Sequence, residues 1–292
     1  MENGNRSSLQ TKTIVKIEEN INLSSFTTIN IGGNADLIWL ETLQDFERLY
    51  SSKRKIFYIG NGSKLLFSNN IKKYIFAKLG KSFSYIFMEG DKIVVGGATT
   101  TRELLKWCIK NEVQGLEFLA GIPGTMAGIT FMNGGAFGSC IADFLQGVKI
   151  YDRDKEHYLD REDLHPTYRH IDIHKEAIIY EIHLKNFTKG KREKIVTRVD
   201  FLLNRRKNSI PQEPSAGCIF KNTKNAPAGL LIEKAGLKGY TIGDAQVSLK
   251  HANIFINRGK ATFEDVVKLI ELAKKAVYEK FGISLEEEII IV

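Results

Sequence analysis

The sequence predicts an α+β fold, because helix and strand patterns mix along the chain without the regular alternation of a doubly wound parallel sheet. Residues 56–59 form an apolar run that leads into a glycine-rich turn, which is typical of a buried strand. Apolar side chains recur at helical spacing over residues 266–281. Thr262 and Asp265 are placed to form a capping box at the start of that helix, and Gly282 is placed to end it.

Two further helices are predicted from their capping residues, one near residue 45 and one near residue 105. Thr42, with Asp45 three residues later, predicts a short helix through Tyr50. In the second segment, which follows residue 80, the second capped helix runs from Thr100 or Thr101 through Lys110. The same segment is predicted to contain strands at 85–88, 92–95, 148–151 and 177–184 and a helical stretch at 195–206.

A third segment starts near residues 210–211. Its first helix is predicted over residues 228–235, because Pro227 stands at the entry and Gly236 at the exit. These breaks divide the chain into predicted domains of residues 1–80, 81–206 and 207–292. The last residues either stay in the third domain or pack back on the first.

The composition is that of a globular protein. Hydrophobic residues make up 43% and charged residues 26% of the 292 residues, and no apolar run approaches the roughly 20 residues that span a bilayer. The first residues are polar and contain no apolar signal core. The three cysteines, Cys108, Cys140 and Cys218, form no CxxC pair, which favours a reducing compartment. We therefore expect a cytoplasmic protein with no membrane partner.

The net charge of +8 does not predict a nucleic-acid partner. The densest basic clusters, at 53–55, 189–194 and 205–207, are short and lack interleaved aromatic residues. A solvated surface with a few anion contacts is the favoured interpretation of these clusters.

Four glycine-rich turns are the least ordinary feature of the sequence. Glycine lets backbone N–H groups approach a ligand closely and permits positive φ, so several such turns can hold a diphosphate. Each turn taken alone is more often an ordinary turn, and none matches a P-loop or a GxGxxG helix start. Together they favour a large phosphate-bearing cofactor. The first turn lies at 60–63, the second at 121–125 and the third at 133–138, and a fourth lies at 31–33.

Ordered motifs that include these turns resemble the UDP-N-acetylenolpyruvoylglucosamine reductase family over nearly the whole chain. They lie at 28–33, 60–63, 115–138, 214–222, 229–236, 250–253 and 285–288. The resemblance implies an FAD-binding fold of the vanillyl-alcohol oxidase type in two parts, followed by a C-terminal α+β substrate-binding domain. It also implies a monomer that acts on a small molecule. The spacing between Arg169 and Arg205 is similar to the shorter form of the family, which lacks a substrate-closing insertion.

The resemblance implies FAD contacts in the glycine-rich turns and beside them. The residues are Ile31, Gly32, Gly33, Gly60, Asn61, Gly62, Ser63, Gly121, Ile122, Pro123, Gly124, Thr125, Gly128, Asn133, Gly135 and Ala136.

The reaction that the resemblance implies is the reduction of UDP-N-acetylglucosamine enolpyruvate to UDP-N-acetylmuramate, a peptidoglycan precursor. NADPH would supply a hydride through FAD to C3 of the enolpyruvyl group, and C2 would then be protonated. Such a reaction needs a cation for the developing enolate and an acid at C2. By resemblance, Arg169 polarises the carboxylate, Cys218 is the proton donor and Glu288 positions the carboxylate side.

The chemistry of these residue types suits the implied roles. A guanidinium is always charged and grips a carboxylate with two hydrogen bonds, as Arg169 would. A thiol has a reference pKa of about 8.5, so Cys218 can act as an acid near neutral pH. Most cysteines are inert and buried, which is how we interpret Cys108 and Cys140. One residue departs from the family, because Ile171 stands where a serine is usual.

Glu288 is selected among three consecutive glutamates because Leu285 and Ile289 fix the register of the family motif. For the sugar nucleotide, the resemblance implies contacts from Tyr168, Lys221, Asn222 and, for the diphosphate, Lys250.

Three rival interpretations stay open. His170, Asp172 and His174 alternate along a strand and could imitate a metal site, although such a trio rarely converges unaided. Another FAD-dependent oxidoreductase of the same fold would act on a different substrate. A basic binding protein without catalysis would be colourless.

Overall fold

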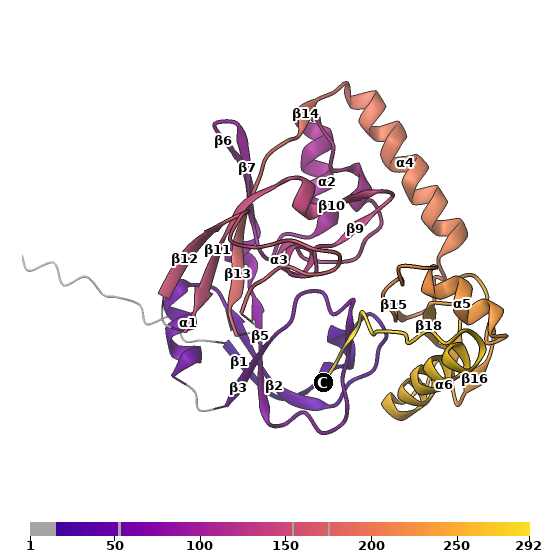
Figure 1. The fold of residues 1–292 in the computed structure, drawn as a ribbon. Helices are drawn as coiled ribbons and strands as arrows, with labels where there is room; N and C mark the ends of the chain where they lie inside the picture. The colour runs from indigo at the N-terminus through magenta and orange to yellow at the C-terminus, as the bar shows by residue number, and fades with distance from the viewer. Residues whose placement is uncertain (1–15, 52–53, 154, 175) are drawn as a thin grey trace, which may run out of the picture.

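The computed structural model describes residues 16–51, 54–153, 155–174 and 176–292, and Figure 1 shows the chain. Residues 1–15 of the first predicted domain and Lys53 of the first basic cluster lie outside the described residues. Each of the three main sheets lies within one of the predicted domains. The domain boundaries themselves stay a prediction. In the part of the chain that the structure describes, no helix is long and apolar enough to cross a membrane.

The first sheet has the order β1-β2-β5-β3. Strands β2 and β3 both pair with β5 in parallel, and β1 is antiparallel to β2. Helix α1 follows β2, and the glycine-rich turn at 60–63 follows β3. The elements are β1 (Lys16–Asn22), β2 (Asn34–Leu40), α1 (Leu43–Tyr50), β3 (Lys55–Tyr58), β4 (Leu65–Leu66) and β5 (Tyr74–Leu79).

The second sheet is antiparallel, with the order β12-β11-β13-β7-β6. All seven residues of the central strand β13 are buried, and α3 packs against it. Helix α4 runs down from this region to the third unit (Figure 1). The elements are β6 (Ile86–Glu89), β7 (Lys92–Gly96), α2 (Thr101–Lys110), β8 (Val113–Gln114), α3 (Met126–Phe131), β9 (Gly135–Ala136), β10 (Ser139–Cys140), β11 (Leu145–Asp152), β12 (Lys155–Asp160), β13 (Ile178–Leu184), β14 (Thr188–Lys189) and α4 (Arg192–Ser209).

The third sheet has the order β15-β18-β17-β16, and α5 and α6 share its apolar core. The chain then returns to the first unit, because β19 pairs in parallel with β4 (Figure 1). Thr28 and Ser215 tie the same two units together: Ser215 N donates to Thr28 O at 3.0 Å, and Thr28 Oγ1 donates to Ser215 O at 2.6 Å. The elements are β15 (Ser215–Cys218), α5 (Ala228–Lys234), β16 (Thr241–Ile242), β17 (Ala245–Val247), β18 (Ile254–Asn257), α6 (Phe263–Phe281) and β19 (Ile290–Ile291).

The predicted helix caps are confirmed. Thr262 Oγ1 accepts from Asp265 N at 3.1 Å, and Asp265 Oδ2 accepts from Thr262 N at 3.0 Å. Gly282 ends α6 with a φ of 67°. The helical stretch predicted at 195–206 extends further at both ends, because α4 runs from Arg192 to Ser209.

A buried polar network on β13 centres on Glu181. Its carboxylate accepts from Tyr85 Oη at 2.6 Å and lies 2.8 Å from His183 Nε2 and 3.0 Å from Lys149 Nζ. Burial alone would raise the pKa of Glu181, but the hydrogen bonds from these three residues outweigh burial and lower the pKa to about 2.

Glu181→Gln is expected to lower the free energy of unfolding by roughly 2–3 kcal/mol at pH 7. The folded-state pKa lies below the unfolded value of 4.5, so this stability is present above pH 4.5 and is lost as the pH falls towards 2. Urea unfolding at several values between pH 7 and pH 3 measures the difference in unfolding free energy, with exposed Glu47→Gln as the control. A deficit that does not shrink with falling pH would contradict this account.

Candidate active site

The glycine-rich turns at 60–63 and 121–125 lie against each other. A Cβ atom on Gly60 would lie 2.7 Å from Thr125 Oγ1. Gly62 has a φ of 65°, and a Cβ atom there would lie 1.9 Å from Phe26 O. Only glycine fits such a position, since it combines the left-handed backbone with close approach of another main chain.

Several N–H groups of these two turns have no acceptor among the described residues. Gly62, Gly124 and Thr125 are buried residues, and buried N–H groups are rarely left unpaired in folded proteins. Successive main-chain N–H groups without a protein acceptor can bind an anion, which fits the diphosphate of a dinucleotide such as FAD. The groups belong to Asn61, Gly62, Ser63, Gly121, Gly124 and Thr125.

Of the other predicted cofactor residues, some lie beside these two turns and others pack against main chain and shape a neighbouring loop. Gly128 N donates to Thr125 Oγ1 at 3.4 Å, which keeps it beside the second turn. Gly32 and Gly33 fit closely against main chain, where added Cβ atoms would lie 2.8 Å from Ser24 N and 2.9 Å from Asn69 Cα. These two glycines and buried Ile31 shape the loop that Thr28 N joins to Gly62 O at 3.3 Å.

Asn133 uses its side chain within the protein. Its Nδ2 donates to Thr167 O at 2.7 Å, and its Oδ1 accepts from Ala142 N at 3.2 Å. The third glycine-rich turn therefore braces the segment that carries Arg169.

Glu288 brings the three predicted catalytic residues together. Its side chain is 5% exposed, and its Oε1 lies 2.8 Å from Lys64 Nζ and 3.3 Å from Arg169 Nε. Lys64 Nζ also donates to Cys218 O at 2.8 Å. A guanidinium, a thiol and a carboxylate from three distant parts of the sequence thus form one cluster.

Arg169 joins this cluster to the third glycine-rich turn. Its Nη1 donates to Asn133 O at 3.4 Å and its Nη2 to Gly135 O at 3.2 Å. Arg169 has a φ of 58°, a left-handed conformation that is uncommon outside glycine. Its Nε is buried and, among the described residues, forms the ion pair with Glu288 but no hydrogen bond of good geometry.

A β-bulge aims Cys218 at the cluster. Strand β15 has one more residue than β18 between the pairs Ser215–Ile256 and Cys218–Ile254, and Gly217 takes a φ of 66° in the bulge. Burial raises the pKa of the Cys218 thiol, as does Glu288, while Lys64, Arg169 and Arg206 lower it.

The chain end is fixed against the Cys218 segment by hydrogen bonds. Glu288 N donates to Ile219 O at 2.7 Å. The Asn253 side chain binds both main-chain groups of Phe220. Its Oδ1 accepts from Phe220 N at 2.9 Å, and its Nδ2 donates to Phe220 O at 2.8 Å. Glu286 pairs with Lys221 and Glu287 with Lys274, so Glu288 is the glutamate of the three that enters the cluster.

Family models match two parts of the chain. An FAD binding domain matches residues 41–158, and the C-terminal domain of UDP-N-acetylenolpyruvoylglucosamine reductase matches residues 208–292. A UDP-N-acetylenolpyruvoylglucosamine reductase from Helicobacter hepaticus is 38% identical over 269 residues, covering 92% of this chain and 97% of the relative. Its counterpart from Moorella thermoacetica is 35% identical over 288 residues, covering 96% and 95%. The chain belongs to the UDP-N-acetylenolpyruvoylglucosamine reductase family.

A solved structure supports the same assignment. The crystal structure of the reductase from Thermus caldophilus matches with a TM-score of 0.85 and 31% identity, over 95% of this chain and 99% of that one. The predicted fold class is confirmed, because the α+β chain contains an FAD-binding domain followed by the C-terminal domain of this family. This member of the reductase family is therefore an FAD-binding oxidoreductase.

Sequence reasoning missed two basic residues of the reductase site. Lys64 follows the first turn directly, and that position was the available signal. The sequence predicts a solvated Arg206, and this prediction is wrong because the guanidinium is partly buried. Its guanidinium lies 5.2 Å from the Phe137 ring centroid, and its Nε is buried without a hydrogen-bond partner among the described residues.

The predicted substrate residues fall into two places. Tyr168 lies under the Arg169 guanidinium, 5.2 Å from ring centroid to Cζ, and its Oη accepts from Asn222 N at 3.4 Å. Lys221 lies beside Asn222 in sequence and pairs with Glu286. Lys250 is exposed and donates to Lys207 O at 3.4 Å, and no contact among the described residues joins it to the cluster.

The structure explains why an isoleucine is accommodated at position 171, where the family usually has a serine. Ile171 is 1% exposed and packs in the core of the second unit, so its side chain contributes apolar burial there. The rival metal site is not formed, because no three His, Cys, Asp or Glu side chains within the described ranges are placed to hold a metal ion. His174 instead lies 3.6 Å from Asp152.

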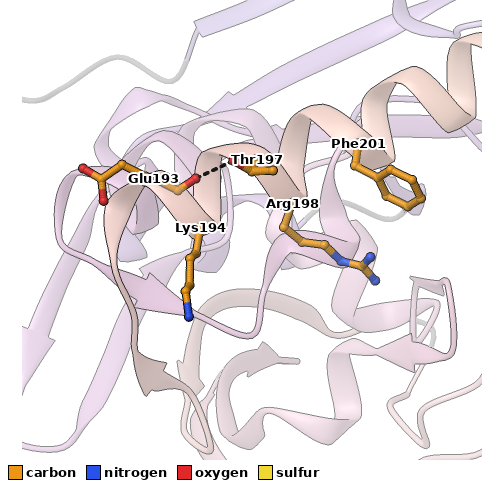
Figure 2. Close-up of a pocket in the computed structure, with 5 residues that line it drawn as sticks. All are labelled: Glu193, Lys194, Thr197, Arg198 and Phe201. Atoms are coloured by element: carbon orange, nitrogen blue, oxygen red, sulfur yellow. Dashed lines mark hydrogen bonds between the residues drawn. The ribbon is translucent and has the colours of Figure 1, made fainter.

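A hollow on the described surface lies apart from this cluster. It has a volume of about 460 Å³ and lies on one face of α4 (Figure 2). Its lining contains none of the predicted site residues, so the reductase site rests on the convergence of turns and charges. The lining residues are Glu193, Lys194, Thr197, Arg198 and Phe201.

Gly62→Ala is expected to weaken FAD binding at least about tenfold, because the left-handed backbone costs roughly 1 kcal/mol and the Cβ atom would overlap Phe26 O. Flavin fluorescence titration of the apoprotein measures the affinity. Gly90→Ala is the matched control, since Gly90 has a φ of 61° with open space around it. Equal FAD affinity in the two variants would contradict the close approach at the turn.

Proposed function

We propose that this reductase uses NADPH to convert UDP-N-acetylglucosamine enolpyruvate into UDP-N-acetylmuramate, as a cytoplasmic monomer in peptidoglycan precursor synthesis. The observation that carries the proposal is the cluster of Arg169, Cys218 and Glu288 beside glycine-rich turns with unpaired N–H groups. Membership of the reductase family supports the substrate.

FAD would lie along the turns at 60–63 and 121–125, where N–H groups that have no acceptor in the described part of the chain can receive its diphosphate. When bound, it supplies the hydride that goes to C3 of the enolpyruvyl group. The protein then has two tasks at the substrate, which are to stabilise negative charge and to deliver a proton.

Arg169 meets the first task. Hydride addition at C3 places negative charge on C2 and spreads it into the substrate carboxylate. The Arg169 guanidinium is held from two sides, by the carbonyls of Asn133 and Gly135 and by Glu288. Fixed donors of this kind stabilise a developing enolate without rearranging during the reaction.

Cys218 meets the second task by giving its Sγ proton to C2. Glu288 is engaged by two cations, Lys64 and Arg169, so it acts as the carboxylate that orients the guanidinium. The thiol is then the neutral acid of the cluster, and solvent returns the proton to sulfur after turnover.

The sugar nucleotide would extend from this cluster towards Tyr168, Asn222 and Lys221, where Asn222 of the third unit donates to Tyr168 of the second. Lys250, exposed on the same unit, would reach the diphosphate. We also propose domain boundaries near residues 80 and 207, between the three main sheets.

The test is NADPH oxidation by the purified holoenzyme with and without the enolpyruvyl sugar nucleotide. We expect consumption only when that substrate is present, with one UDP-N-acetylmuramate formed per NADPH. Substrate-independent oxidation would indicate another flavoenzyme, and a colourless protein that takes up no FAD would indicate a binding protein without catalysis.

A further inference from the structure

Lys64 lies at the centre of the cluster, although neither the sequence patterns nor the family resemblance gave it a role. Its ammonium donates to Cys218 O at 2.8 Å and lies 2.8 Å from Glu288 Oε1. The side chain is 24% exposed. A Cβ atom on Gly217 would lie 3.4 Å from Lys64 Nζ, so the ammonium lies directly beside the bulge that precedes Cys218. One cation thus ties the first glycine-rich turn to the thiol segment and to the chain end.

Four charged groups face Cys218, each from a different part of the chain. Lys64 comes from the turn after β3, Glu288 from the chain end, Arg169 from the loop before β13 and Arg206 from α4. Burial raises the pKa of Cys218, and Lys64 opposes burial more strongly than either arginine does. Its position therefore affects the thiolate more than that of any other cation in the cluster.

We propose that Lys64 is a positioning residue, whose ammonium holds the Glu288 carboxylate and the Cys218 main chain in register and stabilises the thiolate left after Cys218 gives its proton to the substrate. The role rests on the proposed function, because it presumes that Cys218 is the acid. In the proton balance, the proton moves from Cys218 Sγ to substrate C2, and water later reprotonates the thiolate. An ammonium close to the sulfur favours the charged form throughout.

The pH dependence of Cys218 alkylation by iodoacetamide tests this role without any substrate. In the FAD-loaded Cys140→Ser protein, Cys218 is the remaining accessible thiol, since Cys108 is 1% exposed. We expect Lys64→Gln to raise the midpoint by about one pH unit, which lowers the alkylation rate below the midpoint about tenfold. Lys64→Arg keeps the charge and should restore a midpoint near that of the parent protein. An unshifted midpoint in Lys64→Gln would overturn the proposal.

A second variant keeps the test decisive if Lys64→Gln does not fold. Lys64→Met removes the ammonium with a side chain of similar length, so the Cys218 midpoint should rise as in Lys64→Gln. A midpoint that stays or falls there would overturn the proposal by itself. Failure of this proposal can be distinguished from failure of the proposed function. If the midpoints shift in a protein that does not turn over the enolpyruvyl sugar nucleotide, the function is contradicted and the effect of Lys64 on the thiol stands.

Discussion

Replacing Cys218 with alanine is expected to slow reoxidation of the reduced enzyme by the enolpyruvyl sugar nucleotide about 10²–10⁴-fold. The physical reason is the loss of the proton at the position that the β15 bulge aims into the cluster. Reduction of the enzyme by NADPH should stay near normal, because that half-reaction needs no proton on substrate C2. Stopped-flow absorbance of the flavin measures the two half-reactions separately.

Cys218→Ser is the conservative partner of this variant. A hydroxyl can occupy the same place and carry a proton, so we expect measurable turnover. Cys140→Ser controls for loss of a thiol elsewhere, since Cys140 pairs with Asp143 outside the cluster. If Cys218→Ala slowed both half-reactions equally, the assignment of Cys218 as the acid would be wrong.

Arg169→Ala is expected to lower the rate of the same reoxidation step by about 10²–10³, since it removes the cation that faces the developing enolate. FAD should stay bound, because the contacts of the first two glycine-rich turns do not involve Arg169. Rapid-reaction kinetics of the second half-reaction and the flavin content of the purified variant measure both expectations.

A nearby exposed arginine supplies the matched control for Arg169. Arg161 donates from Nε to Ala142 O at 3.2 Å and has no contact with Glu288 among the described residues. Arg161→Ala should therefore leave both half-reactions unchanged. Loss of flavin from Arg169→Ala would show that Arg169 braces the third turn, through its bonds to Asn133 and Gly135, and would contradict the electrostatic role.

The helices were predictable because their signals are local. A capping box joins residues three apart, as Thr42 and Asp45 do, and the structure forms it with Asp45 Oδ2 accepting from Thr42 N at 2.9 Å. The end of α6 at Gly282 follows from the left-handed backbone that glycine permits. Such features need no knowledge of the rest of the chain.

The charges of the site were harder to predict because they are set by distant contacts. Lys64 meets a carbonyl 154 residues away, at Cys218. Its position after the first turn indicates a place near the site but does not indicate this partner. Arg206 belongs to a basic cluster at the end of α4, and only its partial burial distinguishes it from exposed Arg205 and Lys207. Family resemblance supplied Cys218 and Glu288, whereas the link that Lys64 makes between them is seen only in the folded structure.

A single-turnover experiment tests most directly whether the turns hold FAD beside this thiol. The FAD-loaded enzyme is reduced with NADPH without oxygen and then mixed with one equivalent of the enolpyruvyl sugar nucleotide. The account predicts rapid return of oxidised flavin absorbance with one UDP-N-acetylmuramate per FAD in the wild type, and only slow return in Cys218→Ala. A wild-type flavin that stays reduced, or a Cys218→Ala enzyme that reoxidises at the wild-type rate, would contradict it.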